Sequence, residues 1–274
     1  MNATMTVNAF AAHLIAQERS EATIEKYIRH ATRFLDWLGE RELSKELVIQ
    51  WKGTLSGSPS GVNGAIAAVN SLLTFLGHPD WKVRQVRTQR RTYRAKEKNL
   101  TKGEFERLVR TAEAQGNLRL ARAIETIAAT GIRVSELKFI TVESLSEREV
   151  TVKNKGKIRT ILLTAGLVKK LKAYCKQAGI GHGEIFVTRT GRSLARTQLW
   201  AEMKKLCRAA GVEPGKVFPH NLRHLFAVVH YRLHRDIAKL ADLLGHSSIN
   251  TTRIYLIDTG EEHMRQLEAM RLVL

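Results

Sequence analysis

The sequence predicts a mainly α-helical protein with one small β-hairpin, divided into two domains by a basic linker. Three observations lead to this prediction. Apolar residues recur at helical spacing along most of the chain. Convincing strand patterns occur only between residues 149 and 163. Cationic residues concentrate between residues 81 and 99, and the 274 residues suffice for two domains of ordinary size.

The first domain, residues 1–80, is predicted to be a bundle of four amphipathic helices. In the clearest of them Ser20 can cap a helix that runs over residues 23–38, and Gly39 ends it. Three further helices are expected, over residues 8–18, 44–55 and 62–76. Because each helix has one apolar face, the four are expected to pack around a common core.

The predicted linker, residues 81–99, is the most basic part of the chain. Between Lys82 and Lys98 eight cationic side chains accompany a single acidic one, Glu97. We predict that the linker contacts DNA phosphates, and a merely solvated loop is the alternative. The candidate phosphate ligands are Arg84, Arg87, Arg90, Arg91 and Arg94.

The second domain, residues 100–258, begins at a capping box formed by Thr101 and Glu104, and is predicted to be mostly helical. Strands are expected over residues 149–153 and 158–163, joined by a turn at residues 154–157. The remaining expected elements are a short extended piece at residues 185–187, helices from about residue 195, and a final helix within residues 259–274.

Composition restricts the function before any motif does. The 45 Lys and Arg against 26 Asp and Glu give a net charge of +19, which indicates a polyanionic partner. Nucleic acid fits best, and an anionic membrane is the weaker alternative, since no uninterrupted apolar run is long enough to span a bilayer. The absence of any basic residue before Arg19 argues against a signal peptide. We therefore expect a cytoplasmic location and no membrane partner.

Three short motifs place cations, imidazoles and a tyrosine at informative spacings. Arg133 follows a glycine at the expected start of a helix, where free N–H groups favour a phosphate. His220 and Arg223 are three residues apart, so they share one face of a helix. His246, at another expected helix start, precedes Tyr255 by nine residues.

A zinc site is a weaker interpretation of the second motif. His220 and His224 have the spacing of a zinc-binding pair, but Asn221 stands where the metalloprotease pattern has a glutamate. Cys175 and Cys207 are too few for a cysteine-based zinc site or a disulfide framework. We expect no metal here, and a packed His224.

The ordered set resembles the tyrosine recombinase (phage integrase) family, in particular its simple two-domain, Xer-like members. The matching stretches are residues 130–137, 155–159, 219–224 and 243–255, with 23–27 in the first domain. The resemblance implies a SAM-like core-binding bundle followed by a mixed, mostly helical catalytic domain. It also implies a site-specific recombinase that cleaves and rejoins DNA through a covalent 3′-phosphotyrosyl intermediate, in integration, excision, inversion or resolution.

The resemblance further implies the roles of the residues that meet the phosphate. A tyrosine hydroxyl, with a pKa near ~10, is a poor nucleophile until its proton is removed. Tyr255 would attack, and His220 would assist the proton transfer. Arg133 and Arg223 would neutralise the charge of the transition state, and His246 would add a hydrogen bond to the same phosphate.

The hairpin and one carboxylate supply the remaining implied roles. Lys155 is implied as the general acid for the departing 5′ oxygen, and Lys157 is its competitor on the same turn. Glu136 would orient a neighbouring arginine or histidine. The sequence has neither a Gly-rich phosphate loop nor a carboxylate cluster for magnesium, so we expect no metal, no ATP and no other cofactor.

The implied partners are a double-stranded DNA recombination site and further copies of the chain, from dimer to tetramer on synapsed DNA. An accessory DNA-bending factor or a second recombinase would be additional partners. The family also suggests that the final helix docks on a neighbouring subunit through an apolar stripe, with docking on its own catalytic domain as the alternative. That stripe contains Met264, Leu267, Met270 and Leu274.

Two other functions compete with this hypothesis. A type IB topoisomerase shares the cleavage chemistry but rejoins the same strand, and the small first domain argues against it. A non-catalytic DNA-binding regulator would be favoured by a missing nucleophile or arginine, and neither is missing.

Overall fold

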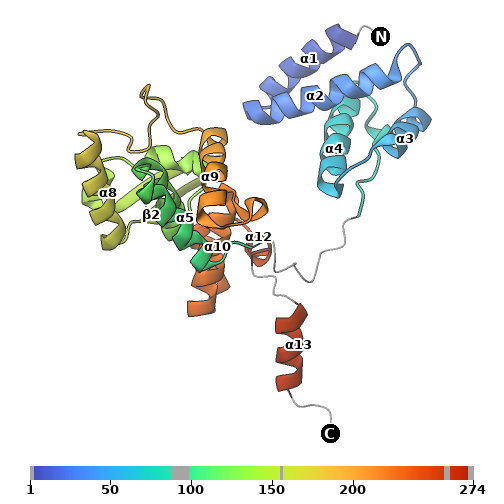
Figure 1. The fold of residues 1–274 in the computed structure, drawn as a ribbon. Helices are drawn as coiled ribbons and strands as arrows, with labels where there is room; N and C mark the ends of the chain where they lie inside the picture. Colours follow the sequence, from blue (N-terminus) through green and yellow to red (C-terminus); the bar gives the residue numbers. More distant parts are fainter. Residues whose placement is uncertain (1–2, 88–98, 155–156, 256–259, 271–274) are drawn as a thin grey trace. The chain divides into compact units, whose positions relative to one another are not determined.

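The computed structural model describes residues 3–87, 99–154, 157–255 and 260–270. The chain divides into two units, Met1–Arg90 and Arg91–Leu274 (Figure 1). Both are mostly helical, and the single sheet of the described part is an antiparallel pair of strands. No described helix combines the length and the apolar character that a membrane crossing requires.

The first unit is a bundle of four α-helices, as the sequence predicts. Its elements are α1 (Ala3–Ala16), α2 (Glu21–Leu38), α3 (Lys45–Thr54), α4 (Pro59–Phe75) and the short 3-10 helix η1 (Pro79–Trp81). The side chains of Ser44 and Ser58 cap α3 and α4 by accepting backbone N–H groups of the first turn. Apolar faces meet in a core that includes Phe10, Phe34 and Leu72.

The chain after η1 runs along α4 in an extended conformation. Asn70 accepts the backbone N–H of Val83 and donates to its carbonyl, at 3.0 and 2.9 Å. Asn63, two turns earlier on α4, holds Val86 in the same way, at 2.8 and 3.0 Å. The start of the predicted linker is therefore attached to the surface of the first unit, and Val83 packs against its core.

The linker arginines divide into two groups. Arg84 and Arg87 are exposed, which leaves their guanidinium groups accessible to a polyanion. Arg90, Arg91 and Arg94 lie outside the described residues. The phosphate contacts predicted for all five remain a prediction.

The second unit is built around one central helix, α6 (Leu118–Thr130). Leu120, Ile124 and Ile127 are buried, and α6 packs against four other helices and one 3-10 helix. These neighbours are α5 (Lys102–Ala114), α8 (Ala165–Ala178), α9 (Arg196–Ala210), α10 (Pro219–His234) and η3 (Val134–Phe139). The other elements are α7 (Ser144–Glu147), β1 (Glu149–Asn154), β2 (Lys157–Leu162), η4 (Pro214–Lys216), α11 (Ile237–Leu244), α12 (Ile249–Arg253) and α13 (Gly260–Ala269).

The hairpin is tighter than the sequence predicts. Asn154 pairs with Lys157, so residues 155 and 156 alone connect the strands, and they lie outside the described part. The helix expected after Arg133 is the short 3-10 helix η3 rather than an α-helix. Helix α8 was not predicted, although the Thr164 side chain caps it and Gly179 ends it in a left-handed conformation.

Candidate active site

A tight turn between α6 and η3 places Arg133. Gly131 ends α6 with φ of +65°, and a Cβ there would stand 2.5 Å from Cδ1 of Phe226 on α10. Only glycine allows both the left-handed backbone and this close approach to α10. Arg133 then occupies the cap position of η3, and its side chain is 40% exposed. The guanidinium therefore remains accessible to a ligand.

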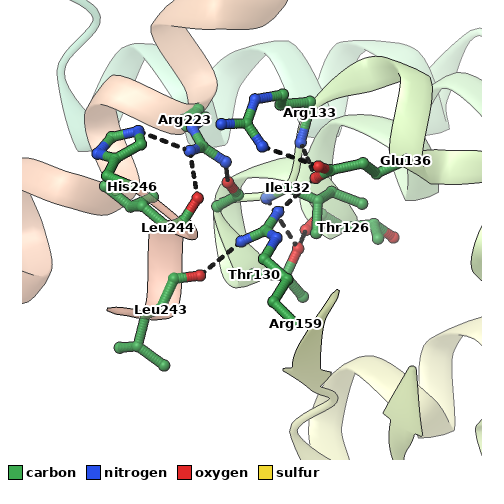
Figure 2. Close-up of polar contacts among 11 residues, drawn as sticks. Thr126, Thr130, Ile132, Arg133, Glu136, Arg159, Arg223, Leu243, Leu244 and His246 are labelled. Carbon is green, nitrogen blue, oxygen red and sulfur yellow. Dashed lines mark hydrogen bonds and ion pairs between the residues drawn. The ribbon is translucent and has the colours of Figure 1, made fainter. Parts of the chain in front are cut away.

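Glu136 holds Arg133 in place through hydrogen bonds to both of its carboxylate oxygens. Its Oε2 accepts the backbone N–H of Arg133 at 2.8 Å, and its Oε1 accepts a guanidinium N–H of the same residue at 2.9 Å. Oε2 also forms an ion pair with Arg159 of β2 (Figure 2). Burial alone would raise the pKa of Glu136, but the Arg133 N–H and the Arg159 charge hold it below its ordinary value. Glu136 is thus a buried, fixed anion.

Arg223 projects from α10 into the same space and is only 2% exposed. Its guanidinium donates to the carbonyls of Gly131 and, at 2.6 Å, Leu244, and to Nε2 of His246 at 2.9 Å. Burial, and then the charge of Arg133, lower the pKa of Arg223 to about 10, and the nearby Tyr255 phenol counteracts them. Arg223 therefore stays cationic at neutral pH.

His246 follows Gly245, the residue that ends α11. Because a guanidinium only donates, Nε2 of His246 must accept from Arg223, and Nδ1 then donates to Oγ1 of Thr252 at 2.9 Å. Burial, followed by the charges of Arg223 and Arg133, lowers the pKa of His246 to about 4. The ring is consequently neutral at physiological pH.

Tyr255 lies at the end of α12 among three imidazoles and is 4% exposed. Its ring stacks on His246, with centroids 5.7 Å apart and planes 5° apart, and meets His224 edge to face at 5.5 Å. Its hydroxyl lies 3.2 Å from Nε2 of His220. The phenol is therefore held in a fixed orientation, within reach of a proton acceptor.

Two hollows meet at Arg133. The larger, about 880 Å³, is lined in part by Arg159 and His246. The second, about 630 Å³, is lined in part by His220 and Arg223. Since Arg133 lines both, an anion at this junction would meet cationic side chains from several elements.

The structure brings together Arg133, Glu136, His220, Arg223, His224, His246 and Tyr255, as the sequence suggests. Lys155 and the side chain of Lys157 lie outside the described part of the structure, so the choice between these two lysines stays a prediction. His224 packs against Tyr255. Among the described residues no three His, Cys, Asp or Glu side chains gather as a metal site requires.

Sequence reasoning missed two residues of this site. Arg159 shares the inward face of β2 with the buried Ile161, and this alternation was the available signal for its position. Thr252 is fully buried, and besides holding His246 it accepts the Tyr255 backbone N–H with its carbonyl at 3.0 Å. Its helical spacing from Tyr255 was the available signal.

The low pKa of His246 predicts a pH dependence of stability. In the unfolded chain His246 takes up a proton near pH ~6.5, whereas in the folded protein it does so only near pH 4. The folded state binds fewer protons between these values, so the free energy of unfolding should decrease as the pH falls through this window. The partly exposed ring limits the effect to about 1 kcal/mol.

This dependence is measured by urea denaturation at pH 5 and pH 7.5. Substitution His246→Gln should remove about that much of the pH dependence, and His182→Gln, at an exposed histidine, serves as the matched control. An identical pH dependence in wild type and His246→Gln would contradict the prediction.

Comparisons with known proteins agree with this geometry. Residues 98–262 match the model of the "Phage integrase family". Tyrosine recombinase XerD of Vibrio cholerae serotype O1 is 25% identical over 272 residues, which cover 90% of this chain and 89% of XerD. Solved structures that share the fold include a XerH recombinase and a lambda integrase.

The first of these structures is a XerH site-specific recombinase bound to its difH substrate. It has a TM-score of 0.69 and 20% identity, and covers 91% of this chain and 79% of XerH. The second is a lambda integrase dimer bound to a COC′ core site. It has a TM-score of 0.73 and 14% identity, and the match covers 94% of this chain and 96% of the solved integrase chain, which comprises residues 75–356.

Proposed function

Because the chain belongs to the phage integrase family, we propose that Tyr255 attacks a DNA phosphate held by Arg133, Arg223 and His246. The protein is a site-specific tyrosine recombinase, and neither the topoisomerase nor the regulator alternative is favoured. One observation carries the assignment of the residues. Arg133 at the start of η3 lines one hollow together with His220 and Arg223 of α10, while His220 and His246 contact the Tyr255 side chain.

The arginines supply the grip on the phosphate. Arg133 is accessible at the junction of the two hollows, and Arg223 is rigidly held by two backbone carbonyls. Fixed donors that need no reorganisation stabilise the charge that develops in a pentavalent transition state. A bound phosphate also places a negative charge beside His246, whose charged neighbours in the free protein are arginines. This charge raises the pKa of His246, and the protonated ring would give up the hydrogen bond that Nε2 accepts from Arg223 and donate from Nε2 to a phosphate oxygen instead.

The proton transfers of the cleavage step follow from the contacts of Tyr255. The Tyr255 hydroxyl passes its proton to His220 as the phenol oxygen bonds to phosphorus. The P–O bond to the 5′ oxygen breaks, and Lys155 or Lys157 protonates that oxygen. The phosphotyrosyl ester conserves the bond energy, so a 5′ hydroxyl of another strand can reverse the step. The cycle thus needs no metal, ATP or other cofactor from solution.

Covalent capture tests this function directly. Purified protein is incubated with a nicked genomic DNA library in the presence of EDTA, and covalently attached fragments are recovered and sequenced. We expect fragments that share one site, joined through their 3′ phosphate to tyrosine. Strict dependence of cleavage on added magnesium, or the absence of any adduct, would contradict the proposal.

The DNA partner is double-stranded, as suggested by the XerH and lambda integrase complexes with their sites. Arg84 and Arg87 at the start of the linker are exposed, which supports a contact with the DNA backbone. We expect glutamine at positions 84, 87, 90, 91 and 94 to weaken binding to all sequences alike. Each lost phosphate contact should reduce the slope of log K against log salt by ~0.9. An unchanged slope in binding titrations would support the solvated-loop alternative.

Assembly on DNA involves α13 and an apolar hollow on α10. This hollow, about 670 Å³, has apolar walls that include Phe105, Leu225 and Leu233, and Leu233 is largely exposed. On α13 the side chains of Met264 and Leu267 are also exposed. We expect α13 of one subunit to occupy the hollow of its neighbour, joining two to four subunits.

Deleting residues 260–274 should leave binding to a single half-site intact while cooperative pairing and strand exchange are lost. The substitution Leu233→Ser in the hollow should reproduce the loss without shortening the chain, because it removes the apolar surface that receives the helix. Gel shifts and recombination assays measure these effects. A truncated protein that is unfolded as a monomer would indicate docking on the same subunit instead.

A further inference from the structure

Arg159 is a buried cation that the reaction scheme above does not use. It lies on β2, its side chain is 11% exposed, and it contacts two other segments of the second unit. One terminal nitrogen pairs with Glu136, and the other donates to the carbonyl of Leu243 at 2.6 Å (Figure 2). We propose that Arg159 is a positioning residue that fixes the phosphate grip through Glu136 and the end of α11. This inference rests on the proposed function of Arg133, Arg223 and His246.

The first connection runs through Glu136 to Arg133. Arg159 and the backbone N–H of Arg133 share Oε2 of Glu136, while the Arg133 guanidinium takes Oε1. Glu136 is 1% exposed, so without Arg159 a buried carboxylate would lose one of its two charged partners. The carboxylate would then turn toward its remaining donors and move the Arg133 guanidinium with it.

The second connection runs through α11 to Arg223 and His246. Carbonyls at a helix C-terminus have no partner within the helix. At the end of α11, Arg159 takes the carbonyl of Leu243 and Arg223 takes that of Leu244. The two arginines together cap the helix immediately before His246. Loss of Arg159 would free one half of this cap.

Gly245 shows how closely the side chain is fitted. It ends α11 with φ of +63°, and a Cβ there would stand 2.5 Å from Cδ and 3.1 Å from Nε of Arg159. The Arg159 Nε is buried with no hydrogen-bond partner among the described residues. Such an arrangement costs stability, since a buried donor without a partner is unfavourable. The close packing and the two bonded terminal nitrogens therefore fix the position of the guanidinium, although the unpaired Nε lowers the stability of the fold.

Arginine is required here because two acceptors on different segments must be reached at once. A planar guanidinium presents several donors in a rigid fork, whereas a lysine ammonium is a point charge on a flexible stem. Both terminal nitrogens of Arg159 are engaged within the protein. The Arg159 side chain is 11% exposed, whereas that of Arg133 is 40% exposed and bonds only one residue side chain, Glu136, in the described structure. This difference in accessibility separates the positioning role of Arg159 from the phosphate contact of Arg133.

The test uses the full chain and a nicked duplex that carries the site recovered by covalent capture. The variants are Arg159→Lys, Arg159→Gln, Glu136→Gln, and the double variant Arg159→Gln/Glu136→Gln. Arg148→Gln is the matched control, since Arg148 lies at the base of the same hairpin and its side chain donates to the Leu163 carbonyl. Gel shift gives the affinity for DNA, and single-turnover kinetics give the rate of adduct formation.

We expect both Arg159 variants to form adduct about 10- to 100-fold more slowly, because misplaced groups cost rate rather than binding. Affinity should stay within about twofold of wild type. Since Arg159 acts through Glu136, the double variant should be no slower than the slower single variant. A duplex with a 5′-bridging sulfur, whose leaving group needs no proton, should leave the defect in place.

Three results would overturn the inference: an unchanged rate, multiplicative defects in the double variant, or full recovery with the sulfur substrate. Full recovery with the sulfur substrate would mean that Arg159 acts through the hairpin lysine that protonates the leaving oxygen. If Arg159→Gln fails to fold, as judged by its melting curve, Arg159→Lys decides by the same criteria because it retains the charge. Absence of adduct with wild-type protein would contradict the proposed function itself, which keeps the two failures distinct.

Discussion

Replacing Tyr255 with phenylalanine is expected to abolish the covalent protein–DNA adduct while leaving the fold and DNA binding intact. The substitution removes a single oxygen, which lies 3.2 Å from Nε2 of His220 and also interacts with the Arg223 guanidinium. The ring keeps its stacking on His246 and its edge contact with His224. Because one hydrogen bond contributes about 1 kcal/mol, the free energy of unfolding should change by an amount of that order. Adduct formation, in contrast, has no substitute for the missing nucleophile.

The matched control is Tyr231→Phe. Tyr231 is on α10, is half-buried, packs near the same small apolar cluster and lies under the guanidinium of Arg235. This variant should retain the adduct on the nicked duplex at a rate close to wild type. Denaturing gels of both variants, with gel shifts run in parallel, measure the difference. An adduct that persists in Tyr255→Phe and vanishes in Tyr231→Phe would reverse the assignment of the nucleophile.

The sequence predicts the fold class because the helices are amphipathic and their caps are local. Thr101 and Glu104 form the expected capping box, with N–H contacts of 2.8 and 3.2 Å. Ends of elements are less well specified. Helix α8, for example, buries only a narrow stripe of four residues among lysines, so its helical pattern is weak in the sequence. Hairpin register likewise depends on pairing across the strands, which no single strand encodes.

The site was predictable to the extent that its chemistry depends on particular side chains at particular spacings. His220 and Arg223 lie on one turn of α10, and Tyr255 follows His246 through a short helix. The contacts that orient these side chains, in contrast, are made mainly with the backbone. Arg223 and Arg159 are held largely by the carbonyls of Gly131, Leu243 and Leu244.

Any residue type provides a carbonyl, so such contacts leave no pattern in the sequence. The same holds for the burial that makes His246 neutral, since it arises from residues that come together only on folding. Alternation along β2 can therefore predict that Arg159 points inward, but its contacts with Glu136 and with the Leu243 carbonyl become visible only in the structure.

Substitution Arg223→Lys is expected to reduce adduct formation by about 10²- to 10³-fold, the cost of removing a fixed donor from a charge-stabilising site. Lysine keeps the positive charge but offers one nitrogen in place of a fork. Arg223 is 2% exposed, and its fork satisfies the carbonyls of Gly131 and Leu244 as well as Nε2 of His246. A lysine cannot reach all three acceptors, so the free energy of unfolding should also fall, by about 1–3 kcal/mol.

These two effects must be separated, because an unfolded enzyme is also inactive. Single-turnover adduct formation is therefore measured at a temperature where circular dichroism shows Arg223→Lys to be fully folded. Arg232→Lys, at an exposed position in the last turn of the same helix, is the control and should behave as wild type. If folded Arg223→Lys formed adduct within about tenfold of wild type, charge alone would be sufficient at this position. The rigid fork between α6, α11 and His246 would then not be what holds the phosphate.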